Sequence, residues 1–254
     1  QRKTKMQRYF LTDPYESKSE YEVTGESYHH MIRVIRMSKG DHVYLAFANQ
    51  ITIVAEITAV LTDKVLLKEI EKEHQEKELP VHITIASGYP KGDKLEWIIQ
   101  KGTELGAHDF IGFPAQSSVV KWDDKKRVKK QQRCDKIAQE AAEQSHRQVT
   151  PQVTLLATAQ EFYQRLAEYD EIVVAYEEAA KAGEKSQLAK VLSQTVPGAK
   201  ILAIFGPEGG LTPKEIDLLT AQKAVLCGLG PRILRCETAP LYFLSAVSYQ
   251  LELQ

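Results

Sequence analysis

Two glycine-rich segments near the C-terminus hold the residue types that could do chemistry on a bound molecule. The first, residues 206–210, reads GPEGG, and the second, residues 228–240, reads GLGPRILRCETAP. Each follows an apolar run, and glycine and proline set backbone angles and leave space that a ligand can occupy. Arginine and glutamate side chains in the same segments could stabilise an anion or accept a proton. The two segments therefore predict a small-molecule pocket that carries catalytic groups.

The glycine spacing excludes the common nucleotide-binding loops. A dinucleotide-binding fold carries G-x-G-x-x-G after its first strand and an acidic residue about 20 positions later, and neither segment fits that pattern. No Gly-Lys-Ser/Thr follows a glycine at the interval of a Walker phosphate loop. We therefore expect a ligand that is not held by a phosphate cradle.

An alternation of strand and helix patterns from residue 81 onward must position these loops. The expected strands are residues 81–87, 109–114, 171–175, 201–205 and 224–229, and the expected helices are 94–105, 123–146, 160–167, 186–194, 213–221 and 240–251. This alternation predicts a mostly parallel α/β sheet with helices on both faces. Ligands bind such sheets beyond the carboxyl ends of the strands, where both glycine segments fall.

Helix starts support this assignment. Thr212, followed by Pro213 and by Glu215 three residues after the cap, predicts a capping box. Thr238 is expected to cap the last helix in the same way. That helix is apolar around much of its circumference, so we expect it to be buried on more than one side, in the core or at a subunit interface.

The first 70 residues have a different pattern. A short helix is expected at 26–37, followed by β-rich runs at 42–48, 51–59 and 65–70. This pattern indicates a small β-barrel-like unit, with the charged stretch 69–78 as its linker. The expected domains are residues 1–72 and residues 73–254.

The composition suits a soluble globular protein and excludes several other classes. The chain has 254 residues, a formal net charge of −1 and 43% hydrophobic residues, with no run that approaches a membrane span. The polar start is not a signal peptide, and Met6 is expected to be the natural initiator behind a short extension, residues 1–5. Three scattered cysteines without zinc spacing predict a reducing cytoplasm and no structural metal.

One segment carries a strong positive charge although the net charge of the chain is close to zero. Residues 121–136 contain eight basic and three acidic side chains. Such a run is typical of a solvated helix face, and it also fits a surface for nucleic acid.

Four sets of residues together resemble the bacterial RsmE family of the SPOUT class, over essentially the whole chain. They are Arg8-Tyr9-Phe10 with His29, His30, Arg33 and Arg36; the stretch 91–106; Glu140, Glu143, Gln144 and Ser145; and the two glycine segments. The resemblance implies methylation of uridine N3 in 16S rRNA of the assembled small subunit by a homodimer. It also implies a C-terminal trefoil knot that binds S-adenosylmethionine, preceded by a PUA-like β-barrel that binds RNA.

The resemblance and the chemistry of a cationic, phosphate-free methyl donor imply specific roles. Donor contacts are expected from Phe205, Gly206, Pro207, Gly210, Leu229, Gly230, Ile233, Leu234 and Ala239. Arg235 and Arg232 are the candidates to stabilise a uracil anion, with Glu208 or Glu237 as a proton acceptor or a partner of arginine. RNA contacts are expected from Arg8, His30, Arg33, Arg36, Lys91 and Lys94.

Two other functions remain open from the residues. A nicotinamide oxidoreductase on an unknotted sheet would also place glycine loops at strand ends, but it lacks the early glycine fingerprint. A non-catalytic RNA-binding protein would bind ribosomal subunits without methyl transfer.

Overall fold

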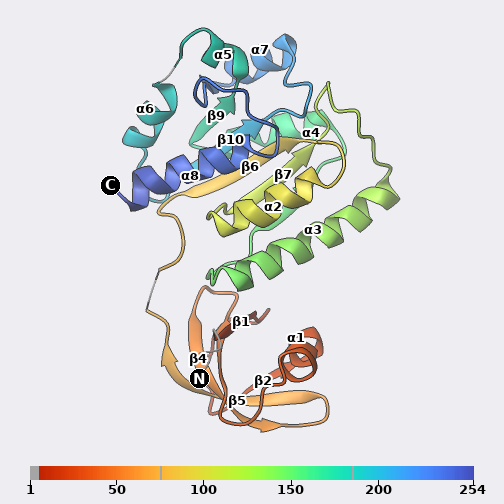
Figure 1. The fold of residues 1–254 in the computed structure, drawn as a ribbon, viewed down its shortest axis with the longest axis vertical. Helices are drawn as coiled ribbons and strands as arrows, with labels where there is room; N and C mark the ends of the chain where they lie inside the picture. Colours follow the sequence, from red (N-terminus) through yellow and green to blue (C-terminus); the bar gives the residue numbers. More distant parts are fainter. Residues whose placement is uncertain (1–5, 75, 185) are drawn as a thin grey trace. The chain divides into compact units, whose positions relative to one another are not determined.

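The computed structural model describes residues 6–74, 76–184 and 186–254, so the expected extension at residues 1–5 lies outside the described residues. The chain divides into two compact units (Figure 1). The first comprises the described residues up to Glu78 together with Ala142–Thr150, and the second comprises Leu79–Ala141 and Pro151–Gln254. No sequence pattern indicated that residues 142–150 belong with the first unit.

The first unit is built on a five-stranded sheet in the order β1-β3-β4-β5-β2. Its strands are β1 (Gln7–Phe10), β2 (Tyr21–Thr24), β3 (His42–Ala46), β4 (Thr52–Val60) and β5 (Lys64–Lys72). β1 pairs with β3 in parallel, and the other pairs are antiparallel. Register shifts between β4 and β5 bend the sheet, and β1 and β2 form its two edges. The sequence predicted β3 to β5 and missed β1 and β2, which have four residues each.

The helix expected at 26–37 is shorter and less regular than the sequence indicated. It consists of α1 (Gly25–His29) and a π-helical turn, His30–Val34. The amide of Met37 donates to the carbonyl of Met31, and Arg36 between them has a φ of 61°. This closure is one residue wider than a Schellman motif, in keeping with the π-helical turn before it, and arginine takes the left-handed position that glycine usually takes.

Charged residues at the end of this unit form ion pairs, where a linker was expected. β5 continues to Lys72, so the first four of the ten residues in the stretch 69–78 belong to a strand and not to a linker. Glu73 binds the guanidinium of Arg8, and Glu78 binds that of Arg147. Arg147 also belongs to the segment 142–150, which explains how this segment is held in the first unit.

The second unit is a six-stranded sheet in the order β11-β9-β10-β6-β7-β8, and all its neighbouring strands are parallel. Its strands are β6 (His82–Gly88), β7 (Asp109–Phe113), β8 (Gln152–Leu155), β9 (Glu171–Ala175), β10 (Lys200–Phe205) and β11 (Val225–Cys227). Its helices are α2 (Lys94–Glu104), α3 (Asp124–Gln144), α4 (Ala159–Gln164), α5 (Glu177–Lys181), α6 (Gln187–Gln194), α7 (Pro213–Ala221) and α8 (Ala239–Glu252), and a 3-10 turn covers Leu166–Glu168. The sequence missed β8 and α5, which are short.

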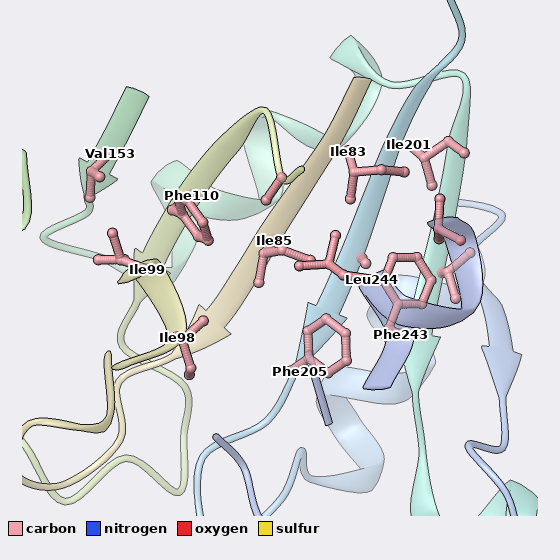
Figure 2. Close-up of a cluster of buried hydrophobic side chains, with 14 of the residues drawn as sticks. Ile83, Ile85, Ile98, Ile99, Phe110, Val153, Ile201, Phe205, Phe243 and Leu244 are labelled. Carbon is pink, nitrogen blue, oxygen red and sulfur yellow. The ribbon is translucent and has the colours of Figure 1, made fainter. Parts of the chain in front are cut away.

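Apolar side chains cover both faces of this sheet, as the alternating pattern predicted. Figure 2 shows one face, where Ile83 and Ile85 of β6 lie among Ile98 of α2 and Phe243 and Leu244 of α8. The other face packs against α4 and α7 in a separate cluster. α8 contacts α2, α6 and β10, so the last helix packs against elements from the early and the late part of the unit's sequence. The trefoil knot expected for this C-terminal segment stays a prediction.

Candidate active site

The two glycine loops emerge from the same edge of the sheet. The first, residues 206–212, follows β10, and the second, residues 228–238, follows β11. β10 and β11 both pair with β9 in parallel, so the carboxyl ends of all three strands point the same way. This strand order is what brings two loops that are 16 or more residues apart into one site.

A cavity of about 670 Å³ lies at this edge. It is large enough for an adenosine-sized ligand. All nine residues expected to contact a methyl donor line it: Phe205, Gly206, Pro207, Gly210, Leu229, Gly230, Ile233, Leu234 and Ala239. Of the four catalytic candidates, Arg235, Arg232 and Glu208 line it as well, together with Lys94, whereas Glu237 is not among the lining residues.

The sequence did not indicate the third side of the cavity. Ala175 and Tyr176, at the end of β9, and Glu177 and Glu178, in α5, also line it. Because β9 lies between β10 and β11 in the sheet, its carboxyl end had to fall between the two glycine loops. The strand order was the missing information, since the residues of β9 carry no motif of their own.

Several neighbours hold the first glycine loop in place. A Cβ atom on Gly206 would lie 2.8 Å from the carbonyl carbon of Gly210 and 2.9 Å from the amide nitrogen of Leu211, so the loop closes against itself there. The hydroxyl of Ser117 donates to the carbonyl of Gly210. This close backbone packing is possible only with glycine at position 206.

The capping box predicted at Thr212 is confirmed. The Thr212 hydroxyl accepts from the amide of Glu215, and the Glu215 carboxylate accepts from the amide of Thr212. The other oxygen of this buried carboxylate accepts from the amide of Gln116 at 2.9 Å. Glu215 thereby ties the first glycine loop to the loop after β7.

Lys94 and Glu208 form an ion pair at the cavity wall. Lys94 Nζ lies 2.7 Å from Glu208 Oε1 and 3.8 Å from Glu237 Oε2. Desolvation raises the pKa of Glu208, but the hydrogen bonds from Lys94 and from backbone amides outweigh it, so the pKa lies below its ordinary value. Glu208 is therefore a carboxylate at neutral pH whose charge Lys94 already engages, which makes it a weak proton acceptor.

The second glycine loop exposes its arginines. Arg232 and Arg235 are exposed, and neither forms an ion pair with another described residue. Desolvation raises the pKa of Glu237, but a backbone hydrogen bond, the Cys236 thiol and the charges of Lys94 and Arg235 outweigh it, so the pKa lies below its ordinary value. Both guanidinium groups can thus meet a substrate at the rim of the cavity.

The cap expected at Thr238 is wrong. Thr238 has helical dihedral angles (φ −87°, ψ −39°), and its side chain caps nothing. The amides of Thr238 and Ala239 both donate to the carbonyl of Arg235, so a backbone turn supplies the acceptor that a side chain usually provides.

The expected RNA-binding residues are divided between the two units: Arg8, His30, Arg33 and Arg36 belong to the first, and Lys91 and Lys94 belong to the second. The RNA contact expected from Arg8 is wrong. The Arg8 side chain is fully buried, bound to Glu73 and hydrogen-bonded to Thr52, so no phosphate can reach it. His30 Nδ1 lies 2.9 Å from the hydroxyl of Tyr9, a packing contact. Of the other expected RNA contacts, Arg33, Arg36 and Lys91 are exposed to solvent, and Lys94 lines the cavity.

The described residues contain no group of three or more His, Cys, Asp and Glu side chains that could hold a metal ion. Among the same residues, no helix is long and apolar enough to cross a membrane.

The sequence matches two protein families and several relatives. Residues 77–248 match the family described as RNA methyltransferase domain, and residues 23–70 match the RNA methyltransferase PUA domain. The chain is 51% identical to ribosomal RNA small subunit methyltransferase E of Bacillus subtilis (strain 168), over 98% of both chains. It is 32% identical to the protein of the same name from Synechocystis, over 91% of this chain and 73% of that one.

Solved structures have the same fold. A protein from Legionella pneumophila in complex with the cofactor SAM superposes with a TM-score of 0.82, 26% identity and coverage of 96% of this chain and 98% of that one. Ribosomal RNA small subunit methyltransferase E from Neisseria gonorrhoeae, bound to S-adenosyl methionine, gives a TM-score of 0.81 at 23% identity over 96% and 97% of the two chains. The full-length identity to the Bacillus protein and the two family matches confirm the resemblance drawn from the motifs: this chain belongs to the ribosomal RNA small subunit methyltransferase E family.

Proposed function

We propose that this chain transfers a methyl group from S-adenosylmethionine to N3 of a uridine in the 16S rRNA of the small ribosomal subunit. The observation that carries the proposal is the cavity after β10 and β11. It gathers every residue expected for the donor and both candidate arginines in one place. Membership of the family and the SAM-bound Legionella relative support the choice of donor.

The walls of the cavity suit this donor. S-adenosylmethionine has an adenine and a methionine portion, and when bound it supplies an electrophilic methyl group on a sulfonium cation. Phe205, Leu229 and Leu234 offer apolar contact, and the glycine loops offer backbone hydrogen-bonding groups. The carboxylates of Glu177 and Glu178 add negative charge to a wall that would face a cation. Lys181 Nζ forms ion pairs with both, at 2.9 Å from Glu177 Oε1 and 2.8 Å from Glu178 Oε1, and so offsets part of that charge.

The arginines of the second glycine loop suit the acceptor. N3 of uracil is a weakly acidic imide nitrogen, and it attacks well only after losing its proton. Arg235 or Arg232 would hydrogen-bond a uracil carbonyl oxygen and stabilise the negative charge that spreads onto it. Glu208 would act mainly through Lys94, by holding the wall of the cavity, because its charge is already engaged.

We further propose that the enzyme is a cytoplasmic homodimer that acts on the assembled 30S subunit. α8 buries Pro240, Phe243, Leu244 and Val247 but leaves Tyr242 42% and Tyr249 57% exposed. These tyrosines line a groove of about 460 Å³ between α6 and α8, which shares Leu229 and Gly230 with the donor cavity. A second subunit on this groove would cover the apolar side of α8 that the single chain leaves open.

Mass spectrometry of 16S rRNA tests the proposal directly. A strain that lacks the gene should lose one 3-methyluridine, and a plasmid copy of the gene should restore it. Purified protein should also bind S-adenosylmethionine in calorimetry, and NAD should not compete. Donor binding without any change in the rRNA would reject the substrate, and NAD binding in the same cavity would favour an oxidoreductase.

A further inference from the structure

The exposed surface of α3 concentrates positive charge in a chain that is nearly neutral. Residues 121–136 hold eight basic and three acidic side chains, while the formal net charge of the whole chain is −1. A local excess of this kind attracts a polyanion whatever the net charge of the protein.

The periodicity of α3 separates a core face from a basic face. Cys134, Ala138 and Ala141 are buried and define the side of α3 that packs on the sheet. With 3.6 residues per turn, Lys125 and Lys129 lie on the opposite side. These two lysines therefore point away from the core of the unit, whereas Arg127 falls on the side of Cys134.

The basic face borders α2. Lys130 Nζ and Arg133 Nε contact the carboxylate of Glu96 in α2, at 2.9 and 2.7 Å. Helical spacing puts Val128 and Asp135 on the other half of the exposed surface. The basic side chains thus form one strip between the exposed ridge of α3 and α2.

Four lysines of this strip carry no counter-ion within the described part of the chain. Lys121, Lys125, Lys126 and Lys129 are exposed and form no ion pair there, whereas Arg127 pairs with Asp124 at 2.8 Å. Neighbouring lysines without carboxylate partners repel one another, which does not help the fold. Phosphate groups would remove that repulsion.

The strip leads to the donor cavity within the same unit. Glu96 and Lys94 lie on one helix, α2, and Lys94 lines the cavity. Exposed Lys91, just before α2, donates its amide to Glu208 of the first glycine loop. α2 lies beside α3 (Figure 1), so basic residues are present on α3, at the start of α2 and at the wall of the cavity.

We propose that the lysine strip formed by Lys121, just before α3, and by Lys125, Lys126 and Lys129 of α3 binds backbone phosphates of the rRNA that flanks the target uridine. This inference rests on the proposed rRNA methylation. RNA is favoured over a protein partner because the strip consists of exposed lysines, three of them on the basic side of α3, while the exposed Val128 lies on the other half of the helix surface. Phosphate contacts position an RNA without reading its sequence.

The test compares two triple variants. Lys125→Gln/Lys126→Gln/Lys129→Gln removes three charges from the strip, and Lys190→Gln/Lys200→Gln/Lys223→Gln removes three exposed charges elsewhere in the second unit. Dissociation constants for 30S subunits and for protein-free 16S rRNA are measured over a series of KCl concentrations. The strip variant should bind both more weakly, and the slope of log Kd against log[KCl] should fall by roughly 2–3 units, for three contacts at about 0.7–0.9 each.

The strip variant should bind S-adenosylmethionine as tightly as the wild type does, and this result would show that its second unit is folded. A Lys→Arg version of the three substitutions should restore RNA binding, because it restores the charge. An unchanged salt slope, an equal loss in the control variant, or failure of the Lys→Arg version to rescue would each overturn the inference. Weakened binding to 30S subunits with normal binding to protein-free rRNA would overturn it in favour of a ribosomal protein.

The wild-type protein separates this inference from the proposed function. If wild-type protein leaves 16S rRNA unmethylated, the proposed function fails. If it methylates normally and the strip variant binds like the wild type, only the role of α3 is wrong.

Discussion

The two glycine loops of the cavity are held in opposite ways. In the first loop, Gly206 closes against its own neighbours, Gly210 is held by Ser117, and Glu215 fixes the end of the loop. The second loop is tied at its start, where the amide of Gly228 donates to Glu184 at 2.8 Å. The chain beyond that point has few partners.

Exposure shows the same difference. Ile233, in the middle of the second loop, is 76% exposed although it lines the cavity, and Arg232 and Arg235 beside it are exposed too. A large apolar side chain left in water is expected to find a partner when a ligand enters. We therefore expect the first loop to shape the cavity beforehand and the second to take its final position with donor and RNA.

Arg235→Ala should have the largest effect. If this guanidinium stabilises a uracil anion, its removal should lower the rate of methyl transfer about 100- to 1,000-fold, with a smaller change in donor affinity. Single-turnover kinetics and calorimetry measure the two quantities separately. Arg232→Ala tests the other candidate in the same loop, and the variant with the larger loss of rate identifies the arginine that stabilises the anion. Equal losses of rate and donor affinity in Arg235→Ala would instead assign Arg235 to donor binding.

Gly206→Ala and Gly230→Ala compare the loops directly. A Cβ at 206 would meet backbone atoms at 2.8 Å, whereas a Cβ at 230 would meet only the Tyr242 hydroxyl, at 3.8 Å. Gly206→Ala should destabilise the protein by about 1–3 kcal/mol and weaken donor binding strongly, since a rigid backbone must shift. Gly230 has a φ of 88°, so alanine there should cost about 1–2 kcal/mol through backbone strain alone.

Thermal denaturation and calorimetry of the two variants are sufficient for this comparison. The greater loss of donor affinity should belong to Gly206→Ala. A larger loss for Gly230→Ala would mean that the second loop, too, is already in its final position before the donor binds.

The sequence predicted the parts of the site that depend on local residue types. The glycine loops, the capping box at Thr212 and the strands that lead into the loops are all encoded within a few neighbouring residues. The resemblance then gave roles to side chains in those loops. For this reason every expected donor residue lies at one cavity.

The sequence failed where partners are distant along the chain. Arg8 looks like a phosphate-binding arginine until Glu73, 65 residues away, is found beside it. The cavity wall from β9 depends on strand order, which no local pattern encodes. The misplaced cap at Thr238 is instead a local error, because the carbonyl of Arg235, three residues earlier, accepts from the amides of Thr238 and Ala239 in place of a side chain. Pairings across long separations need the fold.

Glu208→Gln should have the smallest effect, and it tests whether the ordered first loop takes part in the chemistry. The Lys94–Glu208 ion pair is partly exposed, so its loss should weaken donor binding by about 0.5–1 kcal/mol, roughly two- to fivefold. Because the pKa of Glu208 is lowered, the ion pair contributes fully to donor binding above the ordinary glutamate pKa. This contribution is lost only as the pH falls through the lowered pKa. The ratio of wild-type to variant donor affinity should therefore stay constant from about pH 5 to about pH 8.

The rate of methyl transfer should rise with pH equally in both proteins, since a carboxylate that is already ionised across this range adds no titration of its own. If Glu208→Gln abolished the rising limb of the pH–rate profile, Glu208 would be the proton acceptor, and the division of labour between the two loops would have to be reversed.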